Sequence, residues 1–298
     1  MDNLVVGVDI GGSHITAALV NVTRGSVLQQ TVRRKMVDAE AAADDIINEW
    51  AALLKEVMSL SNVDQQLLIG IAMPGPFDYE NGICLIKEQK KFRSLYEINI
   101  RNILAAKLHI DNFQVHFLND ACSFLCGELL GGVVKGEDKV IGITLGTGLG
   151  SAFYKDRSCT DAELWSHGFK EGIAEDYLST RWFTSEFRGR FGIDVKGVKE
   201  MLPHIQEDSS KAIIFEDFAV NLAQFLLEVY KKTGCSTVVL GGNISKTAGY
   251  FLGKVEQELK KNEVALDIRI SETGESAVIM GAAGEAQNQA RKKTVFPA

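Results

Sequence analysis

The sequence predicts an α/β protein made of two similar halves, each built on a mixed β-sheet. A glycine-rich segment occurs twice, at residues 5–13 and 140–148. The two copies align without a gap, which pairs Val5 with Val140, Gly7 with Gly142, Gly11 with Gly146 and Ala17 with Ala152. In each copy, β-branched residues flank glycines that allow positive φ and close backbone approach. Each copy therefore predicts a strand, a glycine turn and a second strand.

The first half continues the alternation of strands and helices. Strands are expected at 4–10, 15–20, 26–34, 67–72 and 113–118, and helices at 39–60 and 98–108. The longer helix follows from apolar residues at helical spacing, which are Ile46, Trp50, Leu53, Leu54 and Val57. The resulting order, βββαβαβ, is typical of a mixed sheet with helical crossovers.

The second half repeats this order. Strands are expected at 139–145, 150–155, 237–240 and 266–270, and helices at 175–190, 212–232 and 246–261. A last helix begins at Glu275 and carries small residues that would let it pack closely on another backbone, namely Ala277, Gly281, Ala282, Ala283 and Gly284. The repeat places the domain boundary near 118–120. We expect an N-terminal domain of residues 1–118 plus 281–298 and a C-terminal domain of residues 119–280.

Composition excludes several classes of protein. The 298 residues carry a net charge of −7, which gives no support to a nucleic-acid partner. No apolar run approaches the about 20 residues that a membrane span requires. The five cysteines are scattered and odd in number, which disfavours a disulfide framework and favours a reducing cytoplasm. The first expected strand begins at Leu4, so neither a signal peptide nor a DNA-binding helix-turn-helix is expected before Asp9.

Both glycine turns are candidate phosphate sites. Backbone amides of Gly11, Gly12 and Ser13 can point at phosphate oxygens, and Asp9 at the strand end suits Mg²⁺ held through a water molecule. Gly146, Thr147 and Gly148 form the second candidate, in which the threonine adds a hydroxyl. Two such turns facing each other would hold one nucleotide from two sides. The alternative is that both are tight hairpins without a ligand.

Two further positions carry polar residues or glycines at strand ends. Asn119 and Asp120 close one strand and open a helix, so Asp120 is either a helix N-cap or a carboxylate that accepts a proton from a substrate hydroxyl. Gly241, Gly242 and Asn243 follow a buried strand. These glycines either let a flat ring such as adenine lie against the backbone or form a turn that needs positive φ.

Together these segments resemble the ROK family (repressors, open reading frames, kinases) of the actin and hexokinase superfamily. The motifs occur in one order along nearly the whole chain: Asp9-Ile-Gly-Gly-Ser13, Gly70-Ile-Ala-Met-Pro-Gly-Pro-Phe-Asp78, Leu118-Asn-Asp120, Thr144-Leu-Gly-Thr-Gly-Leu-Gly150 and Leu240-Gly-Gly-Asn-Ile-Ser245. The resemblance implies two RNase H-like domains around a central cleft, with MgATP between the two turns. By it, Asp120 is the catalytic base, Asn119 contacts a sugar, and Gly241 and Gly242 belong to the adenosine site.

The sugar-binding segment departs from the family pattern. Glu163 and His167 resemble a family Glu and His that contact the sugar, with one extra residue between them, and Glu175 resembles a further sugar-binding glutamate. The family's cysteine-rich zinc segment is replaced by residues 168–174, which contain no cysteine, so no structural zinc is expected. Residues 87–93 replace the loop that carries a family asparagine.

The sequence therefore predicts an ATP-dependent sugar kinase acting on glucose or a close relative, in the cytoplasm and, as the family commonly is, a homodimer. Residues 87–93 and the extra residue after Glu163 motivate an alternative, a kinase for N-acetylmannosamine or N-acetylglucosamine. A sugar-responsive transcriptional regulator and an inactive sugar-binding protein are alternatives of other classes.

Overall fold

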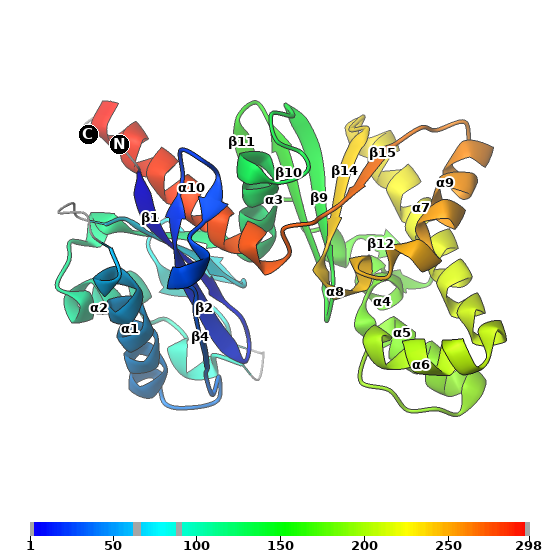
Figure 1. The fold of residues 1–298 in the computed structure, drawn as a ribbon, viewed down its shortest axis with the longest axis horizontal. Helices are drawn as coiled ribbons and strands as arrows, with labels where there is room; N and C mark the ends of the chain where they lie inside the picture. The colour runs from blue at the N-terminus through cyan, green and yellow to red at the C-terminus, as the bar shows by residue number, and fades with distance from the viewer. Residues whose placement is uncertain (1–2, 62–66, 88–90, 296–298) are drawn as a thin grey trace. The chain divides into compact units, whose positions relative to one another are not determined.

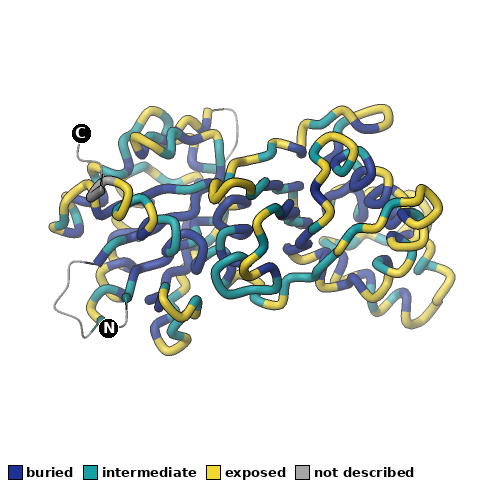
Figure 2. The backbone as a smooth tube through the Cα atoms, turned by 90° about the horizontal axis from the view of Figure 1, so that it is seen from above, coloured by how far each residue is buried: buried dark blue, intermediate teal, exposed yellow. Residues whose placement is uncertain are grey.

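The chain folds into two compact units (Figure 1). A computed structural model describes residues 3–61, 67–87 and 91–295. The first unit comprises residues 1–136 and 273–298, and the second comprises residues 137–272. In Figure 2, buried residues run through the interior of each unit, and exposed residues gather in loops and on outer helix faces.

The first unit is built on a mixed sheet with the strand order β3-β2-β1-β5-β8, and β4 also pairs with β2. These strands are β1 (Leu4–Ile10), β2 (His14–Asn21), β3 (Ser26–Val27), β4 (Arg33–Met36), β5 (Ile69–Met73) and β8 (Val115–Asn119). The sheet is antiparallel from β3 to β1 and parallel from β1 to β8. Its helices are α1 (Ala43–Ser59), α2 (Ile100–Leu108), α3 (Asp120–Gly131) and α10 (Glu275–Val295), and a short hairpin joins β6 (Phe77–Asp78) to β7 (Ile83–Cys84).

The second unit repeats this topology. Its sheet has the order β11-β10-β9-β14-β15, again antiparallel from β11 to β9 and parallel from β9 to β15. The strands are β9 (Lys139–Leu145), β10 (Leu149–Lys155), β11 (Ser158–Asp161), β14 (Thr237–Gly241) and β15 (Asp267–Ile270), and β12 (Gly168–Phe169) pairs with β13 (Gly172–Ile173). The helices are α4 (Ala174–Leu178), α5 (Thr180–Phe191), α6 (Val198–Glu207), α7 (Ile213–Thr233), α8 (Gly242–Ser245) and α9 (Leu252–Lys261). The expected duplication of a mixed sheet is confirmed.

The strand register corrects one detail of the alignment between the two copies. Ile10 pairs with Ile15 around the first glycine turn, whereas Leu145 pairs with Leu149 around the second. The second turn is therefore one residue shorter. Gly7 pairs with Ala18 and Gly142 pairs with Ala152, so Ala152 corresponds to Ala18, and the expected match to Ala17 is wrong.

The expected strand at 26–34 is interrupted. The structure has β3 and β4 on either side of a 3-10 turn, Gln29–Thr31. The backbone amide of Leu19 donates to the Thr31 hydroxyl at 2.9 Å, and that hydroxyl donates to the Leu28 carbonyl at 2.6 Å. Because a side chain replaces the strand partner at this point, the ladder stops and starts again at β4.

Helices α3 and α10 pack with their backbones in contact, which decides the extent of the first unit. A Cβ atom on Gly127 would lie 1.8 Å from the Ala277 carbonyl oxygen, and one on Gly281 would lie 1.8 Å from the Ser123 carbonyl oxygen. The expected close packing of the last helix is thus confirmed. Because α3 belongs with α10, the unit limits lie at 136 and 273, and the expected limits at 118 and 281 would divide this helix pair.

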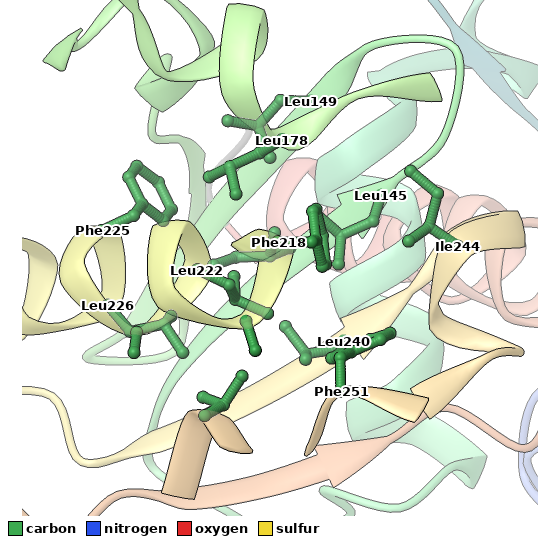
Figure 3. Packing of buried hydrophobic residues seen from close by; sticks show 14 of the residues in the cluster. Leu145, Leu149, Leu178, Phe218, Leu222, Phe225, Leu226, Leu240, Ile244 and Phe251 are labelled. Atoms are coloured by element: carbon green, nitrogen blue, oxygen red, sulfur yellow. The ribbon is translucent and has the colours of Figure 1, made fainter. Parts of the chain in front are cut away.

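The core of the second unit forms where α7 covers one face of the sheet (Figure 3). Phe218, Leu222, Phe225 and Leu226 of α7, which lies in the range expected for a helix, are buried. They belong to one cluster with buried residues of the strands and of smaller helices, among them Leu145, Leu149, Leu178, Leu240, Ile244 and Phe251. Leu145 and Leu149 flank the second glycine turn, so the core fixes both ends of that turn. None of the described helices is both long and apolar enough to cross a membrane.

Candidate functional site

The first glycine turn joins β1 to β2 over residues 11–14. The Gly11 amide donates to the His14 carbonyl at 2.9 Å and closes the turn, while Gly12 and Ser13 are exposed. Asp9 lies two residues before the turn, between Thr16 of β2 and Ala72 of β5. The structure therefore contains the expected strand, glycine turn and second strand, and Asp9 lies on β1 within the sheet.

Asp9 lies in an unusual electrostatic environment. Burial, and then the negative charges of Asp120 and Glu275, raise the pKa of Asp9 from its ordinary 3.8 to about 7, although Arg34 acts in the opposite direction. The structure thus places Asp9 near the predicted base Asp120, within the first unit. A half-buried carboxylate facing further negative charge is a fitting neighbour for a cation, and Mg²⁺ prefers few carboxylates together with waters and phosphate oxygens.

The helix N-cap at α3 is Asn119, not Asp120. Its side-chain oxygen accepts hydrogen bonds from the amides of Ala121 at 2.9 Å and Cys122 at 3.1 Å, and its amide nitrogen donates to the Tyr79 hydroxyl at 3.3 Å. Asp120 is the first helical residue and is exposed, although its carboxylate also accepts from the Ala121 amide. The N-cap explanation for Asp120 is therefore wrong, and its carboxylate is accessible to a substrate.

The second glycine turn, residues 146–148, is held by α4 and α5. The Gly146 carbonyl accepts from both the amide and the hydroxyl of Thr180, each at 2.8 Å. Glu175 accepts from the Leu149 amide at 3.0 Å, and its Oε2 would lie 2.6 Å from a Cβ atom on Gly148. A side chain at residue 148 would therefore displace the Glu175 carboxylate from its present position.

The three residues expected to contact a sugar from the second unit lie on connected segments. His167 accepts a backbone bond from Ala174, next to Glu175, at 2.9 Å. The His167 Nε2 lies 3.1 Å from a carboxylate oxygen of Glu228, and Glu175 also pairs with Arg181 at 3.3 Å. Glu163 is exposed with a φ of 48°. The structure thus gives His167 and Glu175 protein partners, and their sugar contacts remain predictions.

The Gly241-Gly242-Asn243 turn has a structural requirement of its own. Gly242 has a φ of 85°, and a Cβ atom there would lie 2.3 Å from the Leu145 carbonyl oxygen. The Asn243 side-chain oxygen accepts from Lys246 at 2.9 Å. The positive-φ explanation is confirmed for Gly242, and an adenine ring against this turn remains a prediction.

The segment that lacks the family's zinc ligands forms the β12–β13 hairpin. Lys170 at its tip bonds to the Asn221 side chain and lies 5.3 Å from the centre of the Tyr177 ring and 5.6 Å from that of Phe169. Within the described ranges, no group of three or more His, Cys, Asp or Glu residues could hold a metal ion. Of the altered loop at 87–93, residues 88–90 lie outside the described residues, and Lys87 lies over the Tyr96 ring.

Sequence reasoning missed the side chains that surround these turns. Arg34 and Glu275 influence Asp9 although they are 241 residues apart in the chain, and Arg181 pairs with Glu175. No local pattern singles out these residues. Only the pairing of β4 with β2 brings Arg34 beside the first turn.

Comparison with known proteins decides the family. The ROK family model matches residues 5–161, more than half of the chain. The chain belongs to the ROK family. The matched segment of this ROK chain contains both glycine turns, Asn119 and Asp120, but not Glu163, His167, Glu175 or residues 241–243.

Individual relatives are sugar kinases by name. The chain is 32% identical to the glucokinase of Thermotoga maritima, over 49% of this chain and 43% of that protein. This match therefore spans less than half of the Thermotoga protein. The chain is 24% identical to the N-acetyl-D-glucosamine kinase of Photobacterium profundum, over 80% of this chain and 84% of that protein.

A solved relative shows the fold. A ROK family glucokinase from Streptomyces griseus, solved with glucose and AMPPNP, superimposes with a TM-score of 0.75. It is 20% identical, and the match covers 96% of this chain and 99% of the glucokinase. This similarity confirms the expected fold class, an α/β protein built on two mixed sheets.

Proposed function

We propose that this chain is an ATP-dependent sugar kinase that phosphorylates a hydroxyl of glucose or of a closely related hexose. The observation that carries the proposal is the arrangement in the first unit. Asp120 is exposed at the start of α3, and its charge contributes to the raised pKa of Asp9 beside the first glycine turn. A carboxylate that can accept a proton next to a candidate phosphate turn is what phosphoryl transfer to an alcohol requires. The names of the relatives support the sugar-kinase class.

In the proposed reaction, a sugar hydroxyl oxygen forms a bond to the γ-phosphorus while the bond from that phosphorus to the β–γ bridging oxygen breaks. Asp120 takes the hydroxyl proton, and ADP leaves with the bridging oxygen. The amides of residues 11–13 and 146–148 bind the phosphates, and Gly241 and Gly242 border the adenosine. Because the transfer involves little covalent chemistry by the protein, positioning and charge stabilisation account for most of the rate.

Asp9 would hold Mg²⁺ through a water molecule. When bound, Mg²⁺ neutralises charge on the phosphate oxygens and orients them. The donor set fits, because Asp9 faces the negative charges of Asp120 and Glu275, which a cation would offset. Asp9 itself must lose its proton to take this role.

A kinase for an N-acetylated amino sugar is the second candidate. The match to an N-acetyl-D-glucosamine kinase covers 80% of this chain, whereas the match to the Thermotoga glucokinase covers 49%. The segment around Glu163 and His167, which the sequence singles out as altered, falls outside the family-model match. Differences in this segment would change which sugar the protein accepts more readily than they would change the reaction.

A coupled assay for ADP release, run on a panel of sugars, tests the proposal. The panel contains glucose, mannose, fructose, N-acetylglucosamine and N-acetylmannosamine, each with MgATP. We expect turnover with glucose, whereas faster turnover with an N-acetylated sugar would select the second candidate. ADP release that no sugar increases would reject the kinase proposal.

We also propose that the protein acts in the cytoplasm as a homodimer. None of the five cysteines forms a disulfide in the structure, which suits a reducing compartment, and Cys84, Cys122 and Cys235 are buried. Sedimentation at several protein concentrations would test the dimer.

A further inference from the structure

Four side chains form a continuous line of polar contacts from α10 to the first glycine turn. Glu275 Oε2 accepts from Arg34 Nη1 at 2.6 Å, and Arg34 Nη2 lies 3.0 Å from His14 Nε2. His14 Nδ1 in turn lies 3.2 Å from the Ser13 Oγ. The line therefore begins at Glu275, crosses β4 and ends on the hydroxyl of the turn.

The chemistry of the four groups fixes the direction of every hydrogen bond. A guanidinium only donates, so His14 Nε2 must accept from Arg34. A neutral imidazole has one donor and one acceptor nitrogen, so His14 Nδ1 carries the hydrogen and donates to Ser13 Oγ. The Ser13 hydroxyl then accepts from within the protein, and its own hydrogen points away from His14.

The position of the histidine supports this arrangement. Its ring packs against the turn, since a Cβ atom on Gly11 would lie 3.4 Å from the His14 Cε1. Partial burial, and then the positive charge of Arg34, lower the pKa of His14, which keeps the imidazole neutral near pH 7. Glu275 holds Arg34 in place and also affects Asp9, so the line lies beside the proposed cation site.

We propose that Glu275, Arg34 and His14 are positioning residues that hold the Ser13 hydroxyl as a hydrogen-bond donor to a phosphate oxygen of the nucleotide. This inference rests on the proposed function, because it assigns the first glycine turn to the triphosphate. It adds three residues to that site, which otherwise consists of backbone amides, Asp9 and Ser13. None of the three touches the reacting atoms, and their effect passes through the serine.

A double-mutant cycle tests whether Arg34 and His14 act on the nucleotide through Ser13. Affinity for the magnesium complex of AMPPNP is measured by calorimetry, and KM and kcat are measured for MgATP at saturating sugar. Arg34→Met and His14→Ala are each expected to weaken nucleotide binding about five- to tenfold, the effect of one well-oriented hydrogen bond, with a smaller change in kcat. In a Ser13→Ala background, both substitutions are expected to have little further effect. Arg34→Lys, which keeps a charged donor, is expected to restore part of the affinity.

Arg33→Met is the matched control. Arg33 precedes Arg34 on β4 but pairs with Glu56 of α1, so its loss is expected to leave nucleotide affinity unchanged. The proposed positioning role is rejected if Arg34→Met and His14→Ala weaken nucleotide binding as much in the Ser13→Ala background as in the wild type. It is also rejected if the wild type phosphorylates a sugar and neither substitution changes nucleotide affinity, in which case the proposed function stands. A wild type that neither binds nucleotide nor releases ADP would overturn both proposals.

Discussion

At the scale of single residues, substitutions of the neighbours Asp120 and Asn119 should have different effects, the first on the reaction rate and the second on stability. Asp120→Ala is expected to lower kcat by about 10²–10⁴-fold, the usual contribution of one general base. The stability of the Asp120→Ala variant should change little, since the Asp120 carboxylate is exposed and Asn119 caps the helix. Asn119→Ala should instead cost about 1 kcal/mol of stability, because two amides lose their cap. The ADP-release assay and urea unfolding measure the two effects, and an unchanged kcat would remove Asp120 from the reaction.

The raised pKa of Asp9 predicts that the ligand-free protein becomes less stable to unfolding as the pH rises. The folded carboxyl keeps its proton up to about pH 7, whereas the unfolded one loses it near its ordinary 3.8. Between these values the folded state binds more protons, so stability falls as the pH rises through this window, by on the order of 2–4 kcal/mol in total. Asp9→Asn removes the titration. We therefore expect the variant to be more stable than the wild type, by a margin that is larger at pH 8 than at pH 5, while losing most of its activity.

Urea unfolding of both proteins at pH 5, 6, 7 and 8, without Mg²⁺ or nucleotide, measures this difference. Parallel stability curves for the wild type and Asp9→Asn would contradict the prediction. Magnesium and nucleotide are expected to stabilise the wild type more at pH 8 than at pH 6, because the cation competes with the proton for one carboxylate.

Which residues the sequence could predict depends on how local their signals are. Asp9, the two glycine turns and Asp120 lie at strand ends next to glycines or at a helix start, and these patterns are contained in short segments. Arg34 and Glu275 act on the same site through a contact that spans 241 positions. Nothing near either residue marks it, so their role emerges only when the fold brings β4 and α10 together.

At the scale of elements, the contact between α3 and α10 tolerates no side chain. A Cβ atom on Gly127 would meet the Ala277 carbonyl oxygen at 1.8 Å, and two helix backbones cannot move apart without opening the core. Gly127→Ala is therefore expected to lower stability by about 1–3 kcal/mol or more, despite the better helix propensity of alanine. Thermal and urea unfolding measure the change.

Gly189→Ala is the matched control for this contact. Gly189 lies inside α5, is exposed, and has no neighbouring atom within 4 Å of the position that a Cβ atom would take. At this position the substitution changes only the helix propensity, so Gly189→Ala should raise stability by about 0.5–1 kcal/mol. Effects of the same sign at both positions would show that helix propensity, and not backbone contact, decides the outcome.

Elements were predictable in kind but less so in their exact limits. The duplicated strand–turn–strand unit has a strong local pattern, and the structure confirms it in both halves. The one-residue difference between the two turns, and the break at Gln29–Thr31, depend on which backbone groups pair across strands. The sequence of one strand alone does not contain that information.

At the scale of the whole molecule, the chain passes between the two units twice, near residues 136 and 272. On the side of the first unit, buried Glu128 accepts from the Val133 amide at 2.9 Å and from the Thr273 hydroxyl. On the side of the second unit, Arg269 pairs with Glu137 at 2.8 Å. One carboxylate in each unit thus ties the two connecting segments together.

These two carboxylates differ in burial, and their substitutions should differ accordingly. Glu128→Gln replaces one acceptor oxygen of a fully buried carboxylate by a donor, which should cost about 2–3 kcal/mol and expose the segments near residues 133 and 273 to protease. Glu137→Gln weakens a pair whose side chains remain about one-third exposed, so it should cost less than about 1 kcal/mol. Urea unfolding and limited proteolysis with mapped cleavage sites compare them. Equal losses of stability, or cleavage away from both connecting segments in Glu128→Gln, would mean that this carboxylate does not hold the connections.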